Sequence, residues 1–130
     1  MRWIWLLAVA FVLMLAGCGA VGGLSEQRTV DGVTFTLERA PSLQLLQEYT
    51  YVIALADAAG QPIEGATVFL DQQMPAMPMG SSQPIAEPLG GGRYQVRGVY
   101  TMEGDWVVQV HAIVGGQERV ATFDQIVSPQ

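Results

Sequence analysis

Alternation of apolar and polar residues is the main structural signal beyond residue 30. In VTFTL, Val33, Phe35 and Leu37 fall on one side and two threonines on the other. Such a period of two is typical of half-buried strands. The same alternation, broken by Gly- and Pro-containing turns, recurs over residues 49–56, 66–71, 94–100 and 106–113. Short strands at such spacing indicate an all-β fold, and we expect an antiparallel β-sandwich of about seven strands.

The first seventeen residues have the layout of a secretory signal. A single positive charge at Arg2 precedes an apolar run from Trp3 to Leu15. This run is shorter than the roughly 20 apolar residues that a bilayer-spanning helix needs. Small residues follow it, as they do before the cleavage site of a signal peptide. We therefore expect residues 1–17 to be a signal peptide.

The end of this segment, LAGC at residues 15–18, resembles the bacterial lipobox. The resemblance implies cleavage before Cys18, the only cysteine of the chain, and lipid on its sulfur and its new amino terminus. Residues 18–28 would then tether the following domain, residues 29–128, to a membrane on the side facing away from the cytoplasm. An uncleaved signal anchor with an incidental cysteine is the alternative.

Acidic residues outnumber basic ones in the rest of the chain. Without Arg2, five arginines face twelve aspartates and glutamates, and there is no lysine. Such a surface repels phosphate backbones, so we expect no nucleic-acid partner. A single cysteine cannot form an internal disulfide. One histidine, no unmodified thiol and no glycine-flanked serine leave no nucleophile with a neighbouring base, so we do not expect an enzyme.

The segment DQQMPAMPMG, residues 71–80, contains three of the six methionines. Thioether sulfur is a soft, uncharged ligand that favours Cu(I). The prolines push the residues before them, Met74 and Met77, toward extended or polyproline conformation. An extended chain projects Met77 and Met79 to one side, and a polyproline helix does so for Met74 and Met77, so a site with all three sulfurs needs a bend. The segment predicts either a Cu(I) site or an apolar plug or contact surface.

Three residues outside this segment are further candidates. Met102 would face the methionine segment if their two turns lie at one end of the sandwich, and an ordinary turn methionine is the alternative. His111 is the weaker candidate, because it lies several residues into a strand and a lone histidine is more often structural than a ligand. We expect Trp106 to anchor the core, with a cation–π contact to Cu(I) as its less favoured role.

The order of four motifs makes the chain similar to the YtkA-like domain, which is related to FixH-type proteins. These motifs are GATVFLD, MPAMPM, GRY and MEGDW, and the resemblance covers residues 30–127. It implies an immunoglobulin-like sandwich outside the cytoplasm, associated with copper handling or cytochrome oxidase assembly. FixH-type proteins keep a transmembrane anchor, whereas this chain has the lipobox-like segment. The matching positions are Gly65, Ala66, Val68, Met74, Pro75, Met77, Met79, Gly92, Tyr94, Met102, Gly104 and Trp106.

We therefore expect a lipid-anchored protein of the cell envelope that binds rather than catalyses. The first hypothesis is a Cu(I) site made by Met74, Met77 and Met79, together with Met102. Such a protein would buffer copper or pass it to a copper exporter or a cytochrome oxidase component. The alternative hypothesis is a metal-free interaction module whose Met–Pro segment contacts a membrane-protein partner.

Overall fold

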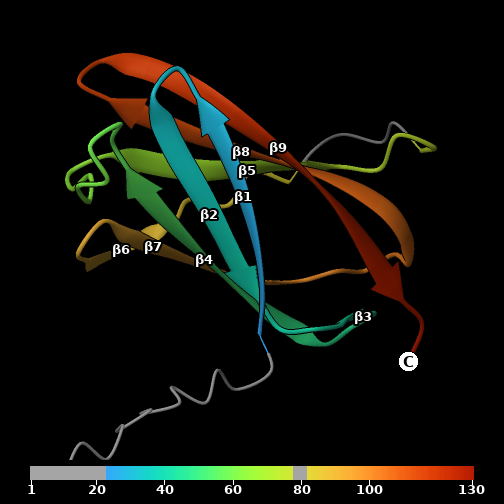
Figure 1. The fold of residues 1–130 in the computed structure, drawn as a ribbon. Helices are drawn as coiled ribbons and strands as arrows, with labels where there is room; N and C mark the ends of the chain where they lie inside the picture. Colours follow the sequence, from blue (N-terminus) through green and yellow to red (C-terminus); the bar gives the residue numbers. More distant parts are fainter. Residues whose placement is uncertain (1–22, 78–81) are drawn as a thin grey trace, which may run out of the picture.

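Two facing β-sheets make up the computed structural model, which describes residues 23–77 and 82–130 (Figure 1). The first sheet has the strand order β1-β2-β4-β7-β6 and the second has the order β3-β9-β8-β5. The strands of the described residues are β1 (Leu24–Val30), β2 (Val33–Arg39), β3 (Leu43–Gln44), β4 (Glu48–Ala56), β5 (Thr67–Gln73), β6 (Glu87–Gly90), β7 (Arg93–Val99), β8 (Gly104–Val114) and β9 (Gln117–Ser128). The predicted signal segment, the lipidation candidate Cys18 and the ligand candidate Met79 lie outside the described residues.

The all-β sandwich expected from the sequence is confirmed. All strand pairs are antiparallel except the short β3, which runs parallel to β9. The described residues form nine strands rather than about seven, because β3 and β6 are too short to show a clear alternation. The strand β1 was also not expected. It begins at Leu24, so residues 24–28 belong to the sheet and not to a flexible tether.

The period-two pattern positions the core as predicted. In β4 the alternate residues Tyr49, Tyr51, Ile53 and Leu55 are buried, and their neighbours are half-buried or exposed. The inner face of β8 likewise buries Val108, Val110 and Ala112. Each large apolar side chain removed from water in this way contributes roughly 1.5–3 kcal/mol. Trp106 packs on the margin of this core and is only partly buried.

The strand β5 is followed by a return segment, residues 82–86, that runs back along it. Isolated bridges join Gln72 to Ser82 and Phe69 to Ile85. The amide of Leu70 donates to the carbonyl of Pro84 at 3.0 Å. The chain then crosses to the first sheet as β6 (Figure 1). The Met–Pro segment therefore connects β5 to the return segment that pairs with it.

Within residues 23–77 and 82–130, no helix has the length and hydrophobicity that crossing a bilayer requires.

Candidate methionine site

Met74 directly follows β5 and lies across the first residue of β8. Its terminal methyl group, Cε, is 3.1 Å from the position that a Cβ atom on Gly104 would occupy. The end of β5 and the start of β8 are neighbours because Gln73 pairs with Val107 in the antiparallel register. The half-buried side chain of Met74 thus occupies space left by the glycine.

Met102 lies in the turn that leads into β8, two residues before Gly104. Its backbone carbonyl accepts a hydrogen bond of 3.0 Å from the indole N–H of Trp106. The indole ring itself packs 4.9 Å from the ring of Tyr100. Trp106 therefore fixes this turn against the core. The structure brings the half-buried Met102 to the same end of the sandwich as Met74.

The backbone turns sharply between Met74 and Met77. The amide of Met77 donates to the carbonyl of Met74 at 3.0 Å, which closes a turn over Pro75. The extended or polyproline conformation expected over 74–77 is therefore wrong. Proline at the second position of a turn has nearly the same φ as in a polyproline helix, so both conformations fit the sequence. The bend that a multi-sulfur site needs is present here.

We call Met74, Met77 and Met102 the methionine corner. Its three members differ in exposure: Met77 is 43% exposed, and the other two are half-buried. The carboxylates of Glu103 and Asp105, on either side of Gly104 in the chain, are exposed. Two thioethers from separate segments and a third on an adjoining turn can supply soft ligands from one end of the fold.

A buried polar network lies next to the corner. Gln72, two residues before Met74, is only 3% exposed and faces the core. Its side-chain Nε2 donates to the hydroxyl groups of Tyr49 at 3.0 Å and Tyr100 at 3.3 Å. The hydroxyl groups of Tyr100 and Tyr51 are 2.6 Å apart. The network therefore links β5 to β4 and to the segment that leads to Met102.

The tyrosines of this network stay protonated at neutral pH. Burial raises the pKa of Tyr49, Tyr51 and Tyr100 above the ordinary phenol value. The sequence analysis did not identify this network. Its signal was a glutamine at an inward position of β5, where the alternation calls for an apolar residue.

His111 lies away from the methionine corner. It pairs with Phe69 in the register of β5 and β8, and the two rings stack with centroids 4.5 Å apart. Its Nδ1 contacts a carboxylate oxygen of Glu118. Val107 is the β8 residue that pairs with Gln73, the last residue of β5 before Met74. His111 lies four positions beyond Val107 along β8, which corresponds to about 13 Å. The structure does not bring this side chain to the methionines.

Histidine, cysteine and carboxylate side chains of the described segments form no cluster of three or more that could hold a metal ion.

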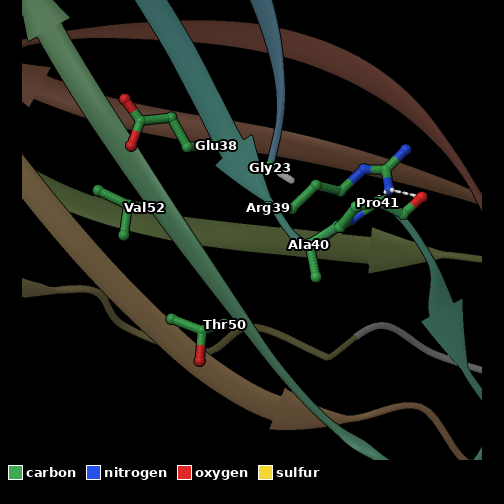
Figure 2. Close-up of a pocket in the computed structure, with 7 residues that line it drawn as sticks. All are labelled: Gly23, Glu38, Arg39, Ala40, Pro41, Thr50 and Val52. Carbon is green, nitrogen blue, oxygen red and sulfur yellow. Dashed lines mark hydrogen bonds between the residues drawn. The ribbon is translucent and has the colours of Figure 1, made fainter. Parts of the chain in front are cut away.

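An open hollow of about 570 Å³ lies on the outer face of the first sheet, around Thr50 and Val52 (Figure 2). Glu38 lines one side of it. On the other side, Nη1 of Arg39 donates to the carbonyls of Ala40 at 2.9 Å and Pro41 at 3.3 Å. No residue of the methionine corner lines this hollow. The candidate soft ligands therefore lie elsewhere in the fold.

Comparison with known proteins assigns the chain to a family. The model of the YtkA-like family matches residues 27–111, more than half of the chain. The protein belongs to this family, as its motifs indicated. Among solved structures, the soluble domain of PmoD from Methylocystis sp. ATCC 49242 (Rockwell) is similar, with a TM-score of 0.51 and 14% sequence identity over 78% of this chain and 96% of that one. This likeness shows a shared fold. No curated protein matches the chain significantly.

Proposed function

We propose that this member of the YtkA-like family binds Cu(I) at the methionine corner. The observation that carries the proposal is the approach of the Met74 methyl group to Gly104, two residues after Met102. It supports the proposal because it puts the side chain of Met74 next to the strand start that directly follows the turn of Met102. Thioethers carry no proton to lose and prefer Cu(I) to harder ions.

The three side chains would have different roles. Met74 is held by its contact with Gly104, and Met102 is held by the hydrogen bond from Trp106 to its backbone. These two would form the fixed part of the site. Met77 is exposed on the adjoining turn and would complete the coordination from the solvent side. Met79 stays a candidate further ligand outside the described residues.

The charge near the corner supports the capture of a cation. Glu103 and Asp105 are exposed beside Gly104, and Asp71 is half-buried in β5. Carboxylates near a soft site raise the local concentration of cations without having to bind them.

The signal-like N-terminus and the lipobox-like LAGC segment support a place in the cell envelope. In this proposal the protein is a lipoprotein anchored through Cys18, facing away from the cytoplasm. It binds rather than catalyses, and it buffers copper or passes it to a copper exporter or a cytochrome oxidase component. Mass spectrometry of the membrane-extracted protein tests the anchor, because cleavage and acylation at Cys18 change the mass of the N-terminal peptide.

A metal-free role in protein interaction is the second candidate, favoured by the 43% exposure of Met77. Methionine is flexible and adapts to varied partner surfaces. On this hypothesis the thioether sulfur itself is dispensable, because a side chain of similar size and hydrophobicity would make the same contacts.

Cu(I) titration separates the two candidates. The full-length protein, extracted in detergent, is titrated under reducing conditions against a coloured Cu(I) chelator. We expect one Cu(I) per chain, and a loss of affinity of about tenfold or more for Met74→Leu and for Met102→Leu, since each removes one soft ligand and keeps the side-chain volume. A thiol assay on the same samples checks that Cys18 is not the ligand. If the wild type binds no Cu(I), or both variants bind it unchanged, the copper proposal is wrong.

A further inference from the structure

In the described residues the two sheets have four edge strands. The return segment 82–86 covers β5. The strand β3 has only two residues and pairs with Val127 and Ser128, and the side chains of β1 lie against the part of β9 before them. The strand β6 contains Pro88 and has a shift of register after it. The strand β1 is different, because it has seven residues, no proline and a largely exposed surface. An open edge of this length is a template for pairing with another strand.

The direction of the backbone groups of β1 follows from its hairpin with β2. The two-residue turn at Asp31 and Gly32, both with positive φ, closes on the pair Val30 and Val33. Such a closing pair is hydrogen-bonded, so every second residue back from Val30 also faces β2. Ser25, Gln27 and Thr29 therefore direct their N–H and C=O groups to the open edge. Consistent with this direction, the Gln27 carbonyl accepts a bond of 2.9 Å from the Arg28 guanidinium.

The sequence of this edge is complementary to itself. When a second copy of β1 runs antiparallel with a two-fold axis at Gln27, Ser25 of each copy lies opposite Thr29 of the other, and all outward backbone groups of these residues are paired. Glu26 of each copy then lies opposite Arg28 of the other. Such a position is a non-hydrogen-bonded pair, where side chains approach most closely and opposite charges are favourable.

Charge also fixes the register of this pairing. Moving the two-fold axis by one residue places Glu26 opposite Glu26 or Arg28 opposite Arg28, and like charges in this position are unfavourable. Only the axis at Gln27 matches the charges and pairs the full central part of the strand.

The two charged side chains are placed to make these contacts. Both lie on the face of β1 that looks toward β9: Glu26 Oε2 accepts from Gln125 Nε2 at 2.7 Å, and the Arg28 guanidinium lies 5.2 Å from the centre of the Phe123 ring. Arg28 is exposed and Glu26 is half-buried. Glu26 has a second carboxylate oxygen, so it can keep its bond to Gln125 and accept from the arginine of a second copy.

We propose that two copies of this protein associate through β1, which joins their first sheets into one continuous antiparallel sheet. The occupant of the open edge is thus the same strand of a second molecule, with Gln27 at the two-fold axis. This association is independent of copper binding.

Cysteine cross-linking in cell membranes tests the pairing. In the full-length chain, Gln27→Cys places two thiols at the axis, with Cα atoms about 5.5 Å apart, within the range of a disulfide. We expect a disulfide-linked dimer after oxidation with diamide. The matched control is Thr122→Cys, an exposed position of β9 in the other sheet, which should stay monomeric. Cys18 is present in both variants. Equal cross-linking of the two variants, or none, would overturn the proposal.

Charge reversal tests the register in the Gln27→Cys background. Either Arg28→Glu or Glu26→Arg alone places like charges opposite each other, and should lower the cross-linked fraction several-fold. The double variant restores opposite charges and should restore the dimer. A double variant that cross-links no better than the single variants shows that Glu26 and Arg28 do not pair across the edge, and the proposed register is then wrong.

Discussion

The methyl group of Met74 packs over Gly104, 3.1 Å from where a Cβ atom would lie. Gly104 also has a backbone φ of +124°, which residues other than glycine rarely adopt. Two separate causes therefore require glycine at the start of β8. Through this contact the side chain that follows β5 is attached to the backbone of the neighbouring strand.

Gly104→Ala should destabilise the fold by about 1–3 kcal/mol, because it combines backbone strain with a close contact to Met74. In a Met74→Ala background the close contact is absent and only the strain remains, so the same substitution should cost less. Chemical denaturation of the four proteins gives the coupling between the two positions. An equal cost in both backgrounds would contradict the contact.

Gln72→Leu should reduce the free energy of unfolding by about 1–3 kcal/mol, because it leaves buried tyrosine hydroxyls without their amide partner. The adjacent Gln73→Leu is the matched control, since Gln73 is exposed and its side chain bonds only to the neighbouring Asp71. It should change stability by no more than about 0.5 kcal/mol. Urea denaturation measures both variants, and similar losses would show that the network is not stabilising.

Alkaline pH should destabilise the domain through the buried tyrosines. Burial raises the folded-state pKa of Tyr51 and Tyr100 above the value of about 10 that tyrosine has in an unfolded chain. The unfolded state therefore loses its phenol protons first. The stability from these groups is complete below about pH 10 and falls as the pH rises above it.

Thermal unfolding at stepped pH, followed together with phenolate absorbance, measures this effect. Tyr100→Phe removes one of the buried phenols and should make the alkaline loss of stability smaller, although it also removes a hydrogen bond at neutral pH. A wild type whose stability stays constant through this pH range would contradict the prediction.

His111→Gln should leave Cu(I) affinity unchanged, because His111 lies seven residues, or about 23 Å, along β8 from Gly104, the residue that Met74 contacts. The substitution removes the ring stacked on Phe69 and should cost about 0.5–1.5 kcal/mol of stability. The same chelator titration and a denaturation curve measure the two effects. A weaker Cu(I) affinity with unchanged stability would place His111 in the metal site.

The inner faces of the sandwich could be predicted because buried and exposed positions alternate along each strand, and apolar and polar residues alternate with them. In β2 and β4 every second residue is apolar and buried, as at Phe35 and Tyr51. The open edge strand β1 could not be predicted in this way. It has solvent on most of its surface, so its sequence shows little alternation.

The candidate site was predictable in its residue types but not in its geometry. The methionine spacing indicated soft ligands. The φ of Pro75 fits a turn as well as a polyproline helix, so the sequence did not show that the backbone bends there. The contact of Met74 with Gly104 depends on the register of β5 against β8, which joins residues far apart in the sequence. The alternation within one sequence does not show which residues of two strands lie opposite each other.

The strand β5 and the return segment 82–86 pair with each other on either side of the Met–Pro connection. Most binding loops must both present side chains and hold their flanking strands together, whereas here the pairing holds the strands. The bridge between Gln72 and Ser82 closes the base of this connection, so its length and residues can vary without moving the sheets. The number of sulfur atoms offered at this end of the molecule can therefore change by insertion or deletion while the scaffold keeps its shape. A set of engineered chains that differ only between Met77 and Ser82 would keep the contact of Met74 with Gly104 and could vary the number of thioethers at nearly constant stability.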